Sequence, residues 1–282
     1  MRRYEAPAKL NLALLVHPPD DSGYHPLDSL VQTVEWCDRL EISEGEGRDR
    51  LEVTGADLDP DDNLVLQAVS VLRRGREVRP LSIRLAKEIP LSAGLGGGSS
   101  DAAAALMGAA ELEQIEDEVL ERTAAEVGAD VVLFLTGGTL RLSGYGEKIE
   151  SIAPLEGFAF AVAVPPFGLS TAEVYRRWDQ LEGPVGDEIP RRDVPPPLRD
   201  GIPLRNDLLP AALAVEPRLG DFMADLRSLW GTAVCLTGSG SGCFAYFPTV
   251  DEAGDAAVAA ASMAGVARAV DLRDRGVSPA DR

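Results

Sequence analysis

The sequence is poor in the residues that bind metals or form disulfides. Among 282 residues there are three cysteines, Cys37, Cys235 and Cys243, and two histidines, His17 and His25. The cysteines are scattered and odd in number, which indicates reduced, partly buried thiols rather than a disulfide framework. Neither residue type occurs at the spacing of a zinc site, so we expect no metal site built by the protein itself.

The chain also lacks a hydrophobic run long enough for a membrane helix. No segment approaches the roughly 18 consecutive apolar residues that such a helix needs. Near the start, two arginines precede an apolar stretch, but Pro7, Lys9 and Asn11 interrupt it, which argues against a signal peptide. We therefore expect a cytoplasmic protein without a membrane partner.

Positive charge is scarce as well. The sequence has 27 lysines and arginines against 46 acidic residues, for a formal net charge of −19. Such a surface repels a phosphate backbone, so nucleic acid is not an expected partner. Only Lys9, Lys87 and Lys148 are lysines. Because lysine offers a compact ammonium where arginine offers a planar fork, Lys9 and Lys87 become candidates for functional positions.

Strand-like and helix-like stretches alternate along the chain, which predicts an α+β protein. Strands are expected at 10–16, 38–45, 49–55, 81–90, 137–152 (as a hairpin), 157–166, 232–238, 243–248 and 268–272. Helices are expected at 62–75, 99–113, 116–127, 217–230 and 250–264. The Pro-, Gly- and charge-rich segment 182–203 is expected to form a long exposed loop, and 273–282 a frayed tail.

Residues 90–105 read PLSAGLGGGSSDAAAA, a loop rich in glycine and serine that runs directly into an alanine-rich helix. A Walker A loop would need a lysine after the glycines, and a dinucleotide fingerprint would need a glycine where Ser99 stands. The features still favour an anion, because glycines let backbone N–H groups approach a ligand and a helix N-terminus carries partial positive charge. The hydroxyls of Ser99 and Ser100 could reach a phosphate oxygen or its Mg²⁺. A tight turn without a ligand is the alternative.

Two further segments accompany this loop, PAKLNL at 7–12 and LTGSGSGCFA at 236–245. In this order the three segments resemble the three motifs of the GHMP kinase superfamily. The shorter segments SGYH, DNLVLQA, GAD and STAEVY narrow the resemblance. They are similar to segments of the kinases that phosphorylate a hydroxyl of a cytidyl-linked methylerythritol in the non-mevalonate isoprenoid pathway. The similarity covers nearly the whole chain, apart from 182–203 and the tail.

The resemblance implies a two-domain fold with ATP in the cleft between the domains. It implies an N-terminal domain similar to ribosomal protein S5 over 1–153, which carries the glycine loop. A ferredoxin-like α+β domain would follow over 154–282. The expected partners are ATP, with Mg²⁺ bound to the nucleotide, and a small-molecule substrate. The expected assembly is a monomer or a weak homodimer.

The resemblance also implies roles for single residues. Asp130 would accept the proton of the substrate hydroxyl, while Lys9 would hold Asp130 ionised and stabilise the developing charge. On the ATP side the resemblance implies Asn63, Lys87, Gly94, Leu95, Gly96, Gly97, Gly98, Ser99 and Ser100. On the substrate side it implies Asn11, Tyr24, His25, Thr171, Tyr175, Gly238, Ser239 and Gly240.

Within the substrate set, Tyr24 and Tyr175 would stack on the two faces of a cytosine ring. Each of three residues could instead have a purely structural role: Asp130 as a helix cap, Lys9 as an exposed charge at a strand end, and Tyr175 as part of the core. Two positions depart from the family pattern, because Ser22 replaces an aspartate and Val132 a proline. Two other functions stay open: a kinase of another small alcohol, of the mevalonate or homoserine type, and an inactive relative that acts as a binding protein.

Overall fold

The computed structural model describes residues 1–282 except 22, 60–62, 75, 281 and 282. The departure at Ser22 and both ends of the first expected helix therefore lie outside the described residues. Within the described part, no helix is both long and apolar enough to cross a bilayer.

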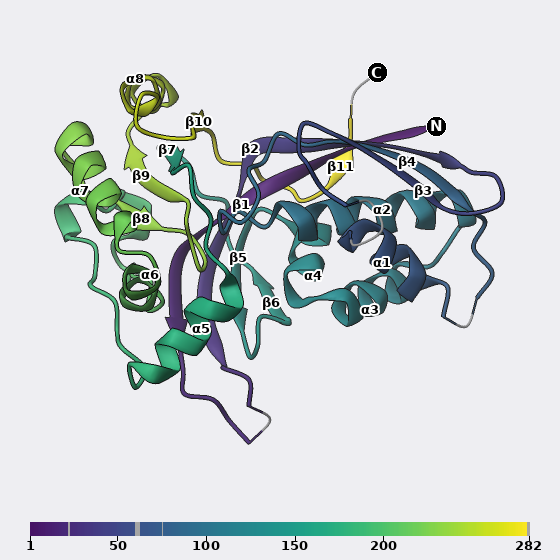
Figure 1. Ribbon diagram of the computed structural model, residues 1–282, viewed down its shortest axis with the longest axis horizontal. Coiled ribbons are helices and arrows are strands. Elements are labelled where there is room, and N and C mark those ends of the chain that lie inside the picture. Colours follow the sequence, from purple (N-terminus) through teal and green to yellow (C-terminus); the bar gives the residue numbers. More distant parts are fainter. Residues whose placement is uncertain (22, 60–62, 75, 281–282) are drawn as a thin grey trace.

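A seven-stranded sheet organises the first half of the chain (Figure 1). Its strands are β1 (Arg2–Val16), β2 (Leu27–Glu44), β3 (Arg50–Thr54), β4 (Leu81–Ala86), β5 (Thr139–Ser143), β6 (Lys148–Ser151) and β11 (Ser278–Pro279). The order is β11-β1-β2-β4-β3, and β5 pairs with both β2 and β6. The long strands β1 and β2 pair along almost their entire length and reach from this sheet into the second half of the molecule.

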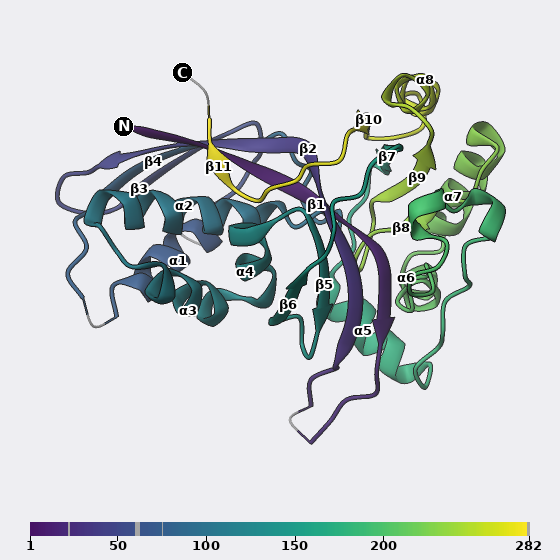
Figure 2. The ribbon, with the colours of Figure 1, turned by 180° about the vertical axis from the view of Figure 1, so that it is seen from behind.

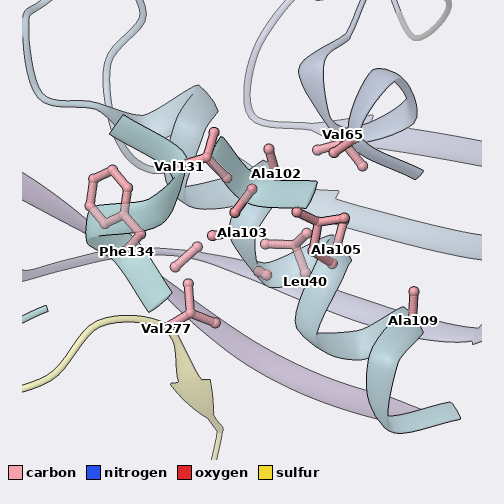
Figure 3. Packing of buried hydrophobic residues seen from close by; sticks show 14 of the residues in the cluster. Leu40, Val65, Ala102, Ala103, Ala105, Ala109, Val131, Phe134 and Val277 are labelled. Atoms are coloured by element: carbon pink, nitrogen blue, oxygen red, sulfur yellow. The ribbon is translucent and has the colours of Figure 1, made fainter. Parts of the chain in front are cut away.

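Four helices cover one face of this sheet: α1 (Leu64–Leu72), α2 (Gly97–Glu113), α3 (Asp117–Val127) and α4 (Ala129–Thr136). Helix α2 lies at the centre of the core, where Ala102, Ala103 and Ala105 pack near Leu40 and Phe134 (Figure 3). Alanine presents only a methyl group, so the helix can lie close to its neighbours. The alanine run after the glycine loop therefore serves to bury the helix that begins at the loop.

A second, antiparallel sheet of four strands organises the rest of the chain. It has the order β10-β7-β9-β8 and is made of β7 (Ala159–Val164), β8 (Cys235–Leu236), β9 (Cys243–Phe247) and β10 (Val266–Val270). Its helices are α5 (Thr171–Gln180), α6 (Leu209–Val215), α7 (Arg218–Trp230) and α8 (Val250–Ala260). Helices α6, α7 and α8 lie on the outer side of this sheet, away from the first half (Figure 2). The α+β prediction is confirmed.

The expectation of a frayed tail is wrong for 273–280, while 281 and 282 lie outside the described residues. Strand β11 pairs with β1 and thereby joins the end of the chain to the first sheet. The side chain of Arg273 is 1% exposed, and its guanidinium donates to Glu35 at 2.6 Å and to Glu5 at 3.1 Å. These partners lie more than 230 residues away in sequence, so a local pattern could not reveal them. The division at 153/154 separates the two sheets except for β11, and as a domain boundary it stays a prediction.

Segment 182–203 is also more ordered than expected. It contains two short 3₁₀ helices, Arg191–Asp193 and Pro196–Leu198, and buries Val194 and Leu198 in the core beneath the second sheet. Several other elements had no counterpart in the sequence predictions: the first parts of β1 and β2, and the whole of α4, α5 and α6. Helix α4 matters most for the site, because Asp130 lies in its first turn.

Candidate active site

A cavity of about 490 Å³ opens between the two halves of the molecule. Its wall combines β1, the glycine loop and the start of α2 with the start of α5 and the loop around 238–239. Most of the residues predicted from the sequence to form the site line this cavity. They are Lys9, Asn11, Lys87, Gly94, Leu95, Gly96, Gly97, Gly98, Ser99, Asp130, Thr171, Tyr175, Gly238 and Ser239.

The glycine loop needs its glycines for two different reasons. Gly94 and Gly96 have φ values of +70° and +72°, in the left-handed region that other residues rarely adopt. A Cβ on Gly94 would also lie 2.1 Å from the carbonyl oxygen of Thr237. At Gly98, by contrast, a Cβ would meet no atom within 4 Å, although this residue lines the cavity. The backbone of Gly98 therefore faces open space in which a ligand can lie.

The start of α2 points free amide groups toward the same cavity. The first bond of its hydrogen-bond ladder runs from the amide of Ser100 to the carbonyl of Gly96, at 3.0 Å. The amides of Gly97, Gly98 and Ser99 precede the ladder and carry the partial positive charge of the helix N-terminus. Such a group of amides suits phosphate oxygens.

The second glycine–serine loop is bonded directly to the first. The amide of Gly242 donates to the carbonyl of Ala93 at 3.0 Å, and the hydroxyl of Thr237 donates to the carbonyl of Gly94 at 3.2 Å. The hydroxyls of Thr171 and Ser239 lie 2.8 Å apart on the cavity wall. Motifs more than 140 residues apart in sequence thus form one continuous surface.

Lys9 and Asn11 lie on the same side of β1, because alternate residues of a strand face the same way. The ammonium of Lys9 donates to the amide oxygen of Asn11, whose nitrogen donates to Ser29 at 2.9 Å. Lys9 is 4% exposed. Burial lowers its pKa below the usual range, and the negative charge of Asp130 opposes this shift. These two described side chains make no direct ion pair with each other, yet both face the cavity.

Asp130 is held by the backbone of α4. The N-cap of this helix is Gly128, so the carboxylate of Asp130 lies in the first turn and is not needed as the cap. Val132 lies inside the same helix, which shows that a regular helix forms here without the proline of the family pattern. Burial raises the pKa of Tyr175 to about 12, and the charge of Asp130 adds to the rise. Asp130 therefore acts electrostatically on both Lys9 and Tyr175.

A model of the family "GHMP kinases N terminal domain" matches residues 63–138. The chain is 39% identical over 251 residues to the 4-diphosphocytidyl-2-C-methyl-D-erythritol kinase of Carboxydothermus hydrogenoformans, which covers 85% of this chain and 86% of the relative. It is 38% identical over 264 residues to the enzyme of the same name from Granulibacter bethesdensis, covering 89% and 87%. The chain belongs to this family of GHMP kinases.

Solved structures agree with this membership. A crystal structure of 4-(cytidine 5'-diphospho)-2C-methyl-D-erythritol kinase superposes with a TM-score of 0.79 at 32% identity, over 96% of this chain and 98% of the other. The homoserine kinase of Cytophaga hutchinsonii shares the fold, with a TM-score of 0.68 at 17% identity over 99% and 97% of the two chains. The GHMP kinase fold predicted from the sequence motifs is confirmed.

Lys87, which lines the cavity, lies in a buried cluster of charged side chains. Its ammonium pairs with Asp38 and, at 2.7 Å, with Asp101, and the side chain is buried. Burial alone would lower the pKa of Lys87, but the charges of the two carboxylates raise it above the usual range. Burial raises the pKa of Asp101 well above its usual range, against the effect of Lys87. Beside Lys87, this shift in pKa favours the protonated form of Asp101.

The kinase site also differs in places from the predicted residue set. Asn63 caps α1 by accepting from the amide of Val65 at 2.9 Å, and it is not part of the described cavity wall. Ser100 is fully buried, and its hydroxyl has no hydrogen-bond partner among the described residues. Gly240 lies behind the wall, where a Cβ would meet Leu169. The roles predicted for these residues stay predictions.

The two aromatic residues expected to face each other have different neighbours. Tyr175 lines the cavity, whereas Tyr24 is 69% exposed and its ring lies against that of Tyr145, with the centroids 6.1 Å apart. The ring of His25, next to Tyr24, lies 5.4 Å from that of Tyr175. Tyr145 lines the cavity. It was not among the predicted residues, and its position in a glycine-flanked hairpin turn was the only signal for it.

Neither carboxylate beside Lys87 was among the predicted residues. Asp101 directly follows the glycine–serine loop, which was a usable signal, whereas the sequence around Asp38 offers none.

Among the described residues, no group of three or more His, Cys, Asp or Glu side chains is placed to hold a metal ion.

Proposed function

We propose that this chain transfers the γ-phosphoryl group of ATP to a hydroxyl of 4-diphosphocytidyl-2-C-methyl-D-erythritol. The observation that carries the proposal is the meeting of Lys9, Asp130 and the start of α2 at one cavity. These groups supply a base, a cation and an anion-binding helix end, which are the parts that phosphoryl transfer requires. Membership in a family named for this reaction supports the substrate.

In the proposed mechanism, Asp130 accepts the proton of the substrate hydroxyl as the oxygen attacks phosphorus. Lys9 stabilises the attacking oxygen and the charge that develops on the transferred group. Because Lys9 is buried, its charge is weakly screened and acts more strongly than it would in water. The hydrogen bond to Asn11 fixes the direction of the ammonium.

The amides of Gly97, Gly98 and Ser99 would bind the phosphates of ATP, and the dipole of α2 would add to the attraction. Mg²⁺ would arrive with the nucleotide rather than at a carboxylate cluster of the protein. We further propose that the protein acts in the cytoplasm, as a monomer or a weak homodimer.

On the substrate side, the cytosine ring would stack on Tyr175 and Tyr24, while Thr171 and Ser239 would contact the diphosphate. Stacking on an aromatic ring contributes about 1–3 kcal/mol per base. This arrangement requires that the two halves of the molecule contribute jointly, since Tyr24 precedes β2 and Tyr175 belongs to α5.

The test is ATP consumption by the purified protein with three candidate alcohols: the cytidyl-linked methylerythritol, mevalonate and homoserine. We expect turnover with the first alone. Turnover with mevalonate or homoserine and none with the cytidyl compound would assign the chain to another alcohol. We do not expect the outcome in which none of the three alcohols raises ATP consumption above the rate measured without an acceptor.

A further inference from the structure

The connection between β1 and β2 joins the two halves of the molecule at the rim of the cavity. Its described residues are 17–21 and 23–26, and it lies at the same end of the molecule as α5 (Figures 1 and 2). Two adjacent residues of this connection contact different partners. The ring of Tyr24 lies against Tyr145 in the β5–β6 turn, and that of His25 lies against Tyr175 of α5.

On the side of the second half, three contacts hold His25. Its Nε2 atom lies 2.7 Å from a carboxylate oxygen of Asp179, and its ring is 5.3 Å from that of Trp178 and 5.4 Å from that of Tyr175. The side chain is only 12% exposed. One ring nitrogen of His25 is thus engaged by Asp179 of α5, and the ring of His25 packs against that of Tyr175 on the same helix.

On the side of the first half, Tyr145 makes the corresponding contacts. Its hydroxyl donates to the carboxylate of Asp20, and its ring meets that of Tyr24 edge to face at 63°. The amide of Leu27 donates to the carbonyl of Gly144 at 2.7 Å, which fixes the turn against the start of β2. Tyr145 is 43% exposed and lines the cavity itself.

The connection is also internally bonded between these two anchor points. The amide of Asp20 donates to the carbonyl of Tyr24 at 3.1 Å, and the amide of Gly23 donates to the carbonyl of Asp20 at 2.9 Å. A hydrogen bond that holds Asp20 therefore also restricts the backbone of Tyr24. Through Asp20, the hydroxyl of Tyr145 thus restrains Tyr24, the residue that the ring of Tyr145 contacts.

We propose that Tyr145 is a substrate-positioning residue that completes the subsite for the flat base. This inference rests on the proposed function. The ring of Tyr145 would form part of the wall beside the base, and its hydroxyl would hold Asp20, and with it Tyr24, over the cavity. Binding to a subsite ordered in advance loses less conformational entropy than binding to a mobile loop. Tyr145 therefore acts on substrate affinity and not on the chemical step.

The first test measures loop order without any substrate. The variant Tyr145→Phe keeps the ring and loses the hydrogen bond to Asp20. We expect faster hydrogen exchange of peptides covering 17–27, with the remaining peptides unchanged. The matched control is Tyr4→Phe, which also removes a tyrosine-to-carboxylate hydrogen bond, here to Glu111, but away from the cavity. Unchanged exchange at 17–27 in Tyr145→Phe would overturn the positioning role of the hydroxyl.

The second test separates binding from chemistry. In Tyr145→Leu we expect the KM for the cytidyl substrate to rise about five- to 150-fold, as for the loss of one stacking ring, while kcat and the KM for ATP change less than twofold. Tyr145→Phe should raise the same KM by at least about threefold, and Tyr4→Phe should leave it unchanged. Thermal melts of each variant exclude misfolding, and Tyr145→Phe suffices if Tyr145→Leu does not fold.

The outcomes also separate this inference from the proposed function. A wild-type protein that does not turn over the cytidyl substrate contradicts the proposed function. The hydrogen-exchange comparison of Tyr145→Phe with Tyr4→Phe then still tests the positioning role, because it needs no substrate. If the protein does turn over the cytidyl substrate, a KM for it within twofold of wild type in both variants would overturn the inference.

Discussion

Gly98 offers a direct test of the phosphate site, because it lines the cavity and a Cβ there would meet open space. A Cβ on Gly98 meets no atom within 4 Å, and the residue lies in the first turn of α2. Its neighbour Gly97 is a poorer choice, since a Cβ there would lie 3.0 Å from Ile89 and 3.1 Å from the ammonium of Lys87. A change at Gly97 would therefore mix ligand binding with packing.

The magnitude follows from what the new side chain displaces. In Gly98→Val the isopropyl group occupies the space beside the free amides, so at least one charge-assisted hydrogen bond to a phosphate is lost. Such a bond contributes about 1.5–3 kcal/mol, which corresponds to an affinity for ATP reduced about ten- to 150-fold. Stability should not fall, because valine has a higher helix propensity than glycine by a few tenths of a kcal/mol.

The assay is calorimetric titration with a non-hydrolysable ATP analogue, together with a thermal melt of the free protein. The matched control is Gly254→Val in α8, where a Cβ also meets no atom within 4 Å but no part of the cavity is near. An analogue affinity equal to wild type in Gly98→Val, with the melting temperature unchanged, would refute the reasoning and leave the loop as a mere turn.

Three other changes probe the rest of the site. Asp130→Asn keeps the size of the side chain and removes the base, so kcat should fall at least about 10²-fold while titrated ATP affinity is kept; turnover within threefold of wild type would exclude the role. Tyr175→Leu should raise the KM for the cytidyl substrate by the equivalent of about 1–3 kcal/mol and leave that for ATP unchanged, and an equal KM in both proteins would remove the ring from the base subsite. Burial lowers the pKa of Lys9, and the ammonium is the active form, so kcat/KM should be lost as pH rises through a pKa below the usual range for lysine; an activity that stays level up to that usual range would contradict this.

Much of the site was predictable because its requirements are local. Gly94 and Gly96 need left-handed backbone, and a helix that starts beside them presents its amides wherever the chain folds. Lys9 and Asn11 share one side of β1 because of the strand period alone. Motifs of this kind depend on neighbours in sequence, so their pattern can be identified before any contact is known.

Other parts of the site depend on contacts between distant segments. Tyr145 meets Tyr24 and Asp20 across about 120 residues, and Lys87 finds Asp38 across 49. Asp130 reaches the cavity that Lys9 lines only because α4, an element that no sequence signal revealed, packs on α2.

The sequence by itself determined the phosphate loop, the order of strands and helices in outline, and the family of the protein. The reason is that glycine conformations, helix ends and hydrophobic periods act over a few residues. Only the tertiary structure decided which aromatic rings surround the cavity, how Lys87 is neutralised, and that Arg273 holds the end of the chain on the first sheet. Those outcomes depend on burial and on ion pairs between segments that only the completed fold brings together.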